Sequence, residues 1–248
     1  MSPPNLATQP ESGGVAQQFS NLKEAISLSE LERGTLLFVP GDTADRLFYL
    51  ASGRVKISAP SRGGKQCILQ VVEAGEIFGE SVLFGHGRRE VTAEVIEKAA
   101  VRVIPGEAAL AFAESHPEFW KSYSRHLGGR VRDLEEQVQW VTFLEVEQRI
   151  ARLLLRWGES HASTTVGRMQ LHLSQRDVAG LVGATRETTS AALNRLRRDG
   201  CLSIGRRCLV VESVDKLARH TGDPRDFSIE PERDDTAVEQ TREHSAGQ

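Results

Sequence analysis

The chain has 248 residues, a formal net charge of −3 at pH 7 and three cysteines, and it is long enough for one or two domains with buried cores. No stretch is as long and apolar as a membrane span, and the first residues lack the basic and apolar parts of a secretion signal. Cys67, Cys201 and Cys208 have neither the even number of a disulfide framework nor the spacing of metal ligands, so we expect a soluble cytoplasmic protein.

Residues 1–18 are rich in Pro, Ser, Gly and Gln, a composition typical of a disordered tail. The N-terminal half that follows contains short apolar or alternating segments, which end in turn-forming sequences such as residues 40–42 and 52–53. Many short strands at this spacing predict a sandwich or small barrel, and we expect a double-wound jelly roll. The expected strands are residues 36–39, 46–51, 54–58, 67–72, 91–96 and 100–104.

A candidate anion site lies in this half, where the glycine-rich residues 75–81 precede Arg89. An arginine fork beside backbone N–H groups at a turn can hold a phosphate. The residue directly after Arg89 is Glu90, however, and its carboxylate would repel a phosphate. We therefore expect Glu80 and Arg89 to form an internal ion pair that braces the loop.

A long helix is predicted from Pro117, which suits a first helical turn, to residue 143. Its apolar residues recur at spacings of 4, 3, 4 and 3, which is a heptad seam. The seam covers about two heptads, so it either packs on its own domain or pairs with a second copy. Residues 143–145 are the expected hinge. The seam residues are Leu127, Val131, Leu134, Val138 and Val141.

Residues 173–196 predict a helix-turn-helix. Ser174 suits the N-cap of the first helix, with Asp177 three residues later in a capping-box arrangement. Gly183 suits the left-handed residue that ends this helix, and Thr185 suits the cap of the second helix. The second helix of such a pair can enter a DNA major groove. Its outward residues are expected to be Arg186, Glu187, Ser190 and Asn194.

Two short apolar strands follow this helix and flank Arg206 and Arg207, as in a winged helix whose basic tip contacts a phosphate. Residues 145–222 contain thirteen Lys or Arg and eight Asp or Glu, a basic balance that fits a DNA-binding module. Residues 223–248 contain three Lys or Arg and eight Asp or Glu, and we expect a disordered acidic tail there.

This helix-turn-helix resembles the DNA-binding half of the cyclic AMP receptor protein and FNR family of bacterial transcription regulators. Thr185, Arg186, Glu187 and Thr188 match the start of that family's recognition helix. The resemblance implies that Arg186 and Glu187 contact bases, while Thr185 and Thr188 contact phosphates. Some members carry a further basic residue where this chain has Ala191, so the operator is expected to differ at that step.

The resemblance extends over residues 20–220, because residues 75–90 are similar to the phosphate-binding cassette of cyclic nucleotide-binding domains. It implies that Glu80 accepts from a ribose hydroxyl and that Arg89 holds the phosphate. Glu90 stands where nucleotide binders have a small hydroxyl residue. Leu134 and Glu135 stand where they place Thr and Ser. We therefore expect an effector pocket around Glu80, Arg89, Glu90 and Leu134 that does not bind cyclic AMP in the usual way.

Other cofactors of the family are not expected either. No cysteine precedes Cys67, which argues against an iron–sulfur cluster. His86 is a possible haem ligand, but a lone loop histidine is more often solvated, and the histidines show no paired spacing for a metal. Cys67 is most simply a small strand residue rather than a redox sensor.

The sequence thus predicts an α+β fold with an N-terminal cyclic-nucleotide-binding-like β jelly roll, a long dimerisation helix and a C-terminal winged helix-turn-helix. The predicted protein is not an enzyme. It is a homodimeric transcription regulator, either activator or repressor, that reads a near-palindromic double-stranded DNA operator, contacts RNA polymerase and involves no membrane. The predicted segments are a tail (1–18), a sensor domain (19–116), a dimerisation helix (117–143), a DNA-binding domain (144–222) and an acidic tail (223–248).

Three alternatives remain at this point. The chain could be a sensor that acts on a protein partner without DNA, or a cyclic-nucleotide-responsive regulator with an altered pocket. It could also be an enzyme of the cupin type, but cupin chemistry needs a His-x-His pair and a carboxylate around a metal, and the predicted strands carry no such pair.

Overall fold

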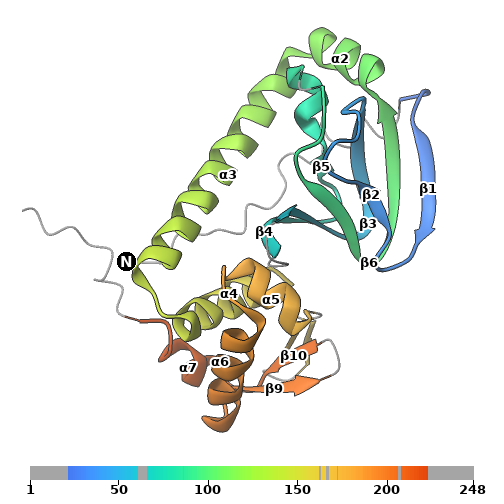
Figure 1. Ribbon diagram of the computed structural model, residues 1–248. Helices are drawn as coiled ribbons and strands as arrows, with labels where there is room; N and C mark the ends of the chain where they lie inside the picture. Colours follow the sequence, from blue (N-terminus) through green and yellow to red (C-terminus); the bar gives the residue numbers. More distant parts are fainter. Residues whose placement is uncertain are drawn as a thin grey trace, which may run out of the picture.

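The computed structural model describes residues 22–60, 66–85, 87–161, 163–165, 168–171, 173–205 and 208–222. Figure 1 shows a β-rich N-terminal lobe and a smaller C-terminal lobe of helices and a short sheet, with the long helix α3 running between them. This architecture confirms the predicted α+β fold class. Both predicted tails (residues 1–18 and 223–248), His86, Arg206 and Arg207 lie outside the described residues.

The N-terminal lobe, called the sensor lobe below, is built on one antiparallel six-stranded sheet. The strands lie in the order β1-β6-β3-β4, with β2 paired to β6 and β5 paired to β3. The short helix η1 (Glu80–Phe84) and α2 (Gly106–Ser115) complete the lobe. The strands are β1 (Ile26–Leu31), β2 (Leu36–Phe38), β3 (Arg46–Pro60), β4 (Gln66–Val72), β5 (Ile77–Phe78) and β6 (Thr92–Pro105).

The turn predicted at residues 52–53 is wrong, because the chain continues through it as the single strand β3. The register between β3 and β6 shifts between Leu50 and Val55, which marks β-bulges that bend the strand without ending it. Gly53 has a φ of 83°, and a Cβ there would lie 2.2 Å from the carbonyl oxygen of Lys98. Glycine at this position therefore serves a close strand-to-strand approach rather than a hairpin.

Two apolar clusters hold the sensor lobe together. The first contains three aromatic rings, Phe38, Phe48 and Phe78, of which Phe48 and Phe78 stack at 5.1 Å between centroids. The second joins the sheet to α2 and to the first turns of α3, where Phe119 and Tyr123 are buried. The start of α3 is therefore part of the sensor lobe.

Helix α3 spans Pro117–Phe143, with the proline in its first turn. The helix ends at Phe143, because Leu144 adopts an extended backbone conformation. Residues Val146–His161 then form α4. Trp140 and Leu144 are buried in the core of the C-terminal lobe, so α3 is anchored in a different lobe at each end. Among the described helices, none combines the length and the apolar character needed to cross a membrane.

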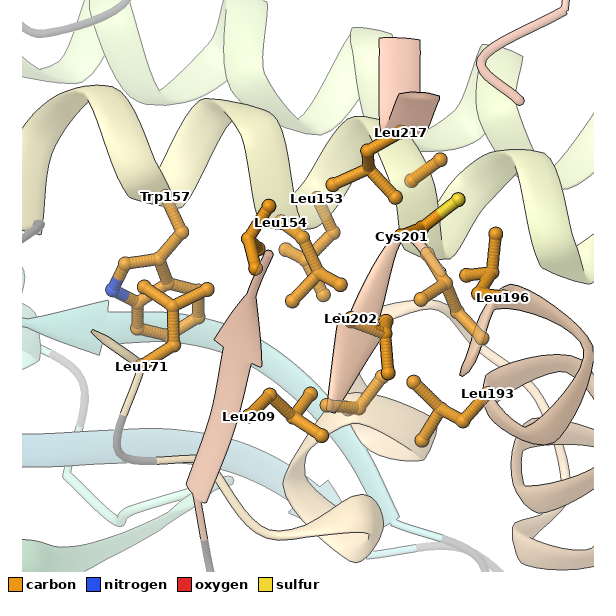
Figure 2. Close-up of a cluster of buried hydrophobic side chains, with 14 of the residues drawn as sticks. Leu153, Leu154, Trp157, Leu171, Leu193, Leu196, Cys201, Leu202, Leu209 and Leu217 are labelled. Atoms are coloured by element: carbon orange, nitrogen blue, oxygen red, sulfur yellow. The ribbon is translucent and has the colours of Figure 1, made fainter. Parts of the chain in front are cut away.

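The C-terminal lobe packs its helices around a four-stranded antiparallel sheet with the order β7-β8-β10-β9. Figure 2 shows its core, in which leucines from α4, α6 and the sheet surround Cys201 and Trp157. The elements after α4 are β7 (Ser163–Thr165), β8 (Arg168–Leu171), α5 (Gln175–Leu181), α6 (Arg186–Arg198), β9 (Leu202–Gly205), β10 (Cys208–Val211) and α7 (Val214–Ala218).

Candidate nucleic-acid interface

Helix α5 begins with the capping box that the sequence predicts. The backbone N–H of Asp177 donates to the Ser174 hydroxyl at 3.1 Å, and the Asp177 carboxylate accepts from the Ser174 backbone N–H at 3.1 Å. Gly183 follows with a φ of 65°, a left-handed conformation that favours glycine. The turn between α5 and α6 is thus fixed by local chemistry on both sides.

Helix α6 begins at the predicted cap. The Thr188 backbone N–H donates to Oγ1 of Thr185 at 3.2 Å, and the two threonine hydroxyls lie 2.9 Å apart. Ala192, Leu193 and Leu196 are fully buried against the core of the lobe. These anchors set the rotation of α6 about its axis and therefore decide which side chains face solvent.

The outward face of α6 begins with its first turn. Arg186, Glu187 and Thr188 are exposed, as is Ala191, where some relatives carry a basic residue. Ser190 and Asn194 are half-buried at the margin of this face. A guanidinium, a carboxylate and a hydroxyl are thereby presented side by side at the N-terminus of a firmly packed helix.

Two side chains in the C-terminal lobe, Glu147 and Arg149, make hydrogen bonds that sequence reasoning missed. Glu147 at the start of α4 accepts from Nε of Arg195 at 2.5 Å and contacts Nδ1 of His220 at 2.9 Å. Burial raises the pKa of Glu147, but the bonds from Arg195 and His220 outweigh it and leave that pKa lowered. Arg149 donates to the carbonyl oxygens of Leu144 and Val182, both at 2.9 Å. It therefore joins the segment between α3 and α4 to the end of α5.

In the region of the predicted effector pocket, Glu80 and Arg89 have different hydrogen-bond partners from those the sequence predicts. The expected Glu80–Arg89 ion pair is wrong, because the Glu80 carboxylate instead accepts from Nη1 of Arg130 on α3 at 3.1 Å. Arg89 donates to the carbonyl oxygen of Gly79 at 2.8 Å and to the Ser81 hydroxyl at 2.8 Å. Sequence spacing could not reveal this, since Arg130 is 50 residues from Glu80.

Arg89 is nearly inaccessible, with 4 % of its surface exposed. Its guanidinium also donates to the Arg46 carbonyl oxygen and lies 4.5 Å above the ring of Phe38. Burial lowers the pKa of Arg89, although nearby carboxylates such as Asp45 partly oppose this. One nitrogen, Nε, is buried without a hydrogen-bond partner among the described residues. The side chain is thus held by the loop and by strands β2 and β3.

The remaining residues of the predicted pocket are accessible to solvent. Glu90 is exposed beside Arg89, and Leu134 is 40 % exposed one turn beyond Arg130 on α3. Within the described ranges, no cluster of three or more His, Cys, Asp or Glu side chains is arranged to hold a metal ion.

The predicted seam of α3 is partly exposed. Val131, Leu134, Val138 and Val141 are all at least 40 % exposed, an unusual number of bare aliphatic side chains on one helix. Leu127 differs, because it is half-buried against the second cluster of the sensor lobe. Phe143 adds a further exposed apolar side chain at the end of the helix.

Two family models match the chain. One is a cyclic nucleotide-binding domain over residues 28–116, and the other is a Crp-like helix-turn-helix domain over residues 148–220. The chain belongs to the cyclic AMP receptor protein and FNR family of bacterial transcription regulators. Its helix-turn-helix is therefore the DNA-binding domain of a CRP-like regulator.

Named members of the cyclic AMP receptor protein and FNR family match most of the chain. The "CRP-like cAMP-activated global transcriptional regulator" of Mycobacterium tuberculosis is 27 % identical over 192 residues, which covers 77 % of this chain and 86 % of that protein. The "Cyclic AMP receptor protein" of Thermus thermophilus is 27 % identical over 173 residues, with 70 % and 78 % covered.

Solved structures of the family share the fold. The c-di-GMP responsive regulator CLP of Xanthomonas campestris superposes with a TM-score of 0.71 at 26 % identity, covering 81 % of this chain and 99 % of CLP. FixK2 of Bradyrhizobium japonicum superposes with a TM-score of 0.66 at 22 % identity, covering 80 % and 97 %.

Proposed function

We propose that the chain reads a specific DNA sequence through the first turn of α6. The observation that carries this proposal is the exposed pair Arg186 and Glu187 on a capped, leucine-anchored helix. A guanidinium can donate twice to guanine, and a carboxylate can accept from the cytosine amino group. Thr185 and Thr188 would contact phosphates, Ser190 and Asn194 would reach further bases, and Arg206 and Arg207 of the wing would add phosphate contacts.

Selection of bound duplexes from a random DNA pool tests this proposal. The purified full-length protein should enrich one short motif, and Arg186→Ala should relax the preference at one base pair of each half-site. Recovery of a pool without any enriched motif would contradict it.

We propose that two copies pair through the exposed seam of α3 formed by Val131, Leu134, Val138 and Val141. Aliphatic residues at heptad spacing on an unpartnered helix face are the pattern by which two helices pack together. A two-fold dimer would place its two α6 helices about one DNA turn apart, so the operator should be a near-palindrome.

We propose that the sensor lobe does not bind cyclic AMP in the usual way. The arginine that would hold the phosphate is committed to Gly79, Ser81 and Arg46, and Glu90 places a carboxylate next to it. Rearranging that buried guanidinium would break several charge-assisted hydrogen bonds. The competing possibility is a regulator that responds to cyclic nucleotides through an altered pocket.

Calorimetric titration with cyclic AMP distinguishes the two possibilities. We expect no binding heat and no change in operator affinity at millimolar cyclic AMP, with the cAMP-activated relative from Mycobacterium tuberculosis as positive control. A saturable response in this protein would contradict our interpretation of Arg89 and Glu90.

We further infer that the protein acts by binding rather than by catalysis, in the cytoplasm, without a required cofactor or an iron–sulfur cluster. As a regulator on DNA it would contact RNA polymerase. Co-purification of polymerase on operator DNA, lost with a shuffled operator, tests that partnership.

A further inference from the structure

The sensor lobe and the helix-turn-helix meet at α5. Figure 1 shows β4 lying directly above α5, while α6 lies farther from the sensor sheet. The approach is close at Gly180, where an added Cβ would lie 2.9 Å from Cγ1 of Ile68 and 3.1 Å from the carbonyl oxygen of Gln66. Val71 of β4 also packs against the core of the C-terminal lobe. The contact is therefore close-packed and depends on a glycine in α5.

A charged network lies beside this contact. Nζ of Lys56 on β3 lies 3.4 Å from Oδ1 of Asp177, and Nη2 of Arg33 lies 3.0 Å from Oδ2 of the same carboxylate. Lys56 also pairs with Glu94 of its own lobe at 3.0 Å. The side chains of Lys56 and Asp177 are only 5 % and 4 % exposed. Such charges are costly to bury unless they are paired, so removing Lys56 while the lobes are docked would leave the Asp177 carboxylate buried with one cation fewer.

Asp177 connects this network to α6. It is the third residue of α5 and half of the capping box with Ser174. Helix α5 in turn leads into α6 through the fixed turn at Gly183, so a constraint on Asp177 is a constraint on the whole helix-turn-helix. Arg186 and Glu187 remain exposed in this arrangement. The docked state therefore keeps the recognition helix accessible while fixing its direction relative to the sensor lobe.

We propose that Lys56 and Arg33 are positioning residues for DNA binding, which hold Asp177 and thereby fix the helix-turn-helix on the sensor lobe in its DNA-competent orientation. This inference rests on the proposed function, because it assigns the sensor lobe a direct role in aiming α6. Neither residue touches DNA in this proposal. Their effect on affinity comes from restricting the orientations that the DNA-binding domain can adopt.

The chain offers a matched control on the same strand. Arg54 is also a partly buried cation of β3, but it pairs with Glu73 at 3.1 Å and with Glu97 at 3.2 Å, both in the sensor lobe. Lys56→Met removes the charge while retaining an apolar stem, and Arg54→Met does the same without touching the C-terminal lobe. Any general weakening of the sheet should appear in both variants, whereas uncoupling of the lobes should appear only in Lys56→Met.

The first measurement is the distance between the lobes in the absence of DNA. Spin or fluorescent labels at Glu107→Cys on α2 and Asp215→Cys on α7, in a Cys67→Ser background, report it directly, since both sites are exposed. With labelled chains diluted in excess unlabelled protein, so that pairs of labels across the proposed dimer do not contribute, we expect a single narrow distance within the chain in the parent protein and in Arg54→Met, and a broadened distribution in Lys56→Met. An unchanged distribution in Lys56→Met would overturn the inference. Because DNA is absent, this result is independent of whether the proposed DNA reading is correct.

The second measurement is the affinity for a selected operator. A coupling of ordinary size would lower affinity about tenfold in Lys56→Met, with no loss in Arg54→Met. Equal operator affinities for the parent protein and Lys56→Met, or an equal loss of affinity in Lys56→Met and Arg54→Met, would overturn the proposal.

Discussion

Arg195 on α6 and Glu147 on α4 are joined by a hydrogen bond of 2.5 Å between Nε and Oε2. The other oxygen of the same carboxylate contacts His220, just beyond α7, at 2.9 Å. One carboxylate thus joins the last turns of α6 to the start of α4. Because Arg195 is engaged here, its charge is directed into the protein rather than toward a phosphate.

Replacing the Glu147 carboxylate should weaken the attachment of α6 to α4 and leave the exposed side chains of α6 unchanged. Glu147→Gln is expected to lower the free energy of unfolding by about 0.5–1 kcal/mol, a modest value because Arg195 is half exposed and its charge is screened by solvent. Urea denaturation measures the change. Glu145→Gln, at an exposed neighbouring position, is the control, and an equal loss in both variants would show that the Arg195 contact has no special effect.

Arg186→Ala should weaken operator binding by roughly 1–3 kcal/mol and relax the preference at a single base pair. The reason is that a bidentate guanidinium contact with guanine has no substitute on an alanine side chain. Fluorescence anisotropy against a set of single-base operator variants measures both effects. Arg198→Ala, at the other end of the same helix, should leave the base preference unchanged. If Arg198→Ala alone altered the preference, the first turn of α6 would not be the reading element.

Val138→Glu should convert the proposed dimer into a monomer at micromolar concentration. Val138 is 65 % exposed on the seam, and a carboxylate buried there on pairing would be unpaired. Sedimentation velocity measures the change. Gln139→Glu introduces the same charge at the next, exposed position and should leave the dimer intact. A dimer that survives Val138→Glu would move the interface away from this face of α3.

Stability should fall as the pH drops below about 6.5, because of His126 on α3. Burial disfavours its charged form and Arg130 adds repulsion, so the pKa of His126 in the folded protein lies below its ordinary value of 6.5. Below pH 6.5 the unfolded chain binds this proton more readily than the folded protein does, and the native state is destabilised. His126→Gln should therefore flatten the plot of unfolding free energy against pH. The same slope in both proteins would contradict this assignment.

The local features of the helix-turn-helix could be predicted from the sequence because each depends on near neighbours. Ser174 and Asp177 cap α5, Gly183 adopts the left-handed conformation and Thr185 caps α6, all through contacts within three residues. The spacing of the apolar residues in α3 likewise predicts that Val131, Leu134, Val138 and Val141 share one face of the helix, and all four are exposed in the structure. Residue spacing carries this information because a helix repeats every few residues.

The contacts that sequence reasoning missed join residues far apart in the chain. Lys56 and Asp177 are separated by 121 residues and Glu80 and Arg130 by 50, so no local pattern links them. The bulge at Gly53 was mistaken for a turn because glycine serves both structures. The sequence predicts a pair between Arg89 and Glu80, but Arg89 instead donates to Gly79 and Ser81 on the loop and to the Arg46 carbonyl oxygen at the start of β3.

Sequence discrimination by α6 can be measured by comparing two duplexes. Anisotropy titrations of the full-length protein with its selected operator and with a shuffled duplex of equal length, at several salt concentrations, give the two affinities under matched conditions. We expect the operator to bind at least about a thousandfold more tightly than the shuffled duplex at physiological salt. Equal affinities that fall together as salt is added would contradict it, since binding would then come from phosphate attraction alone.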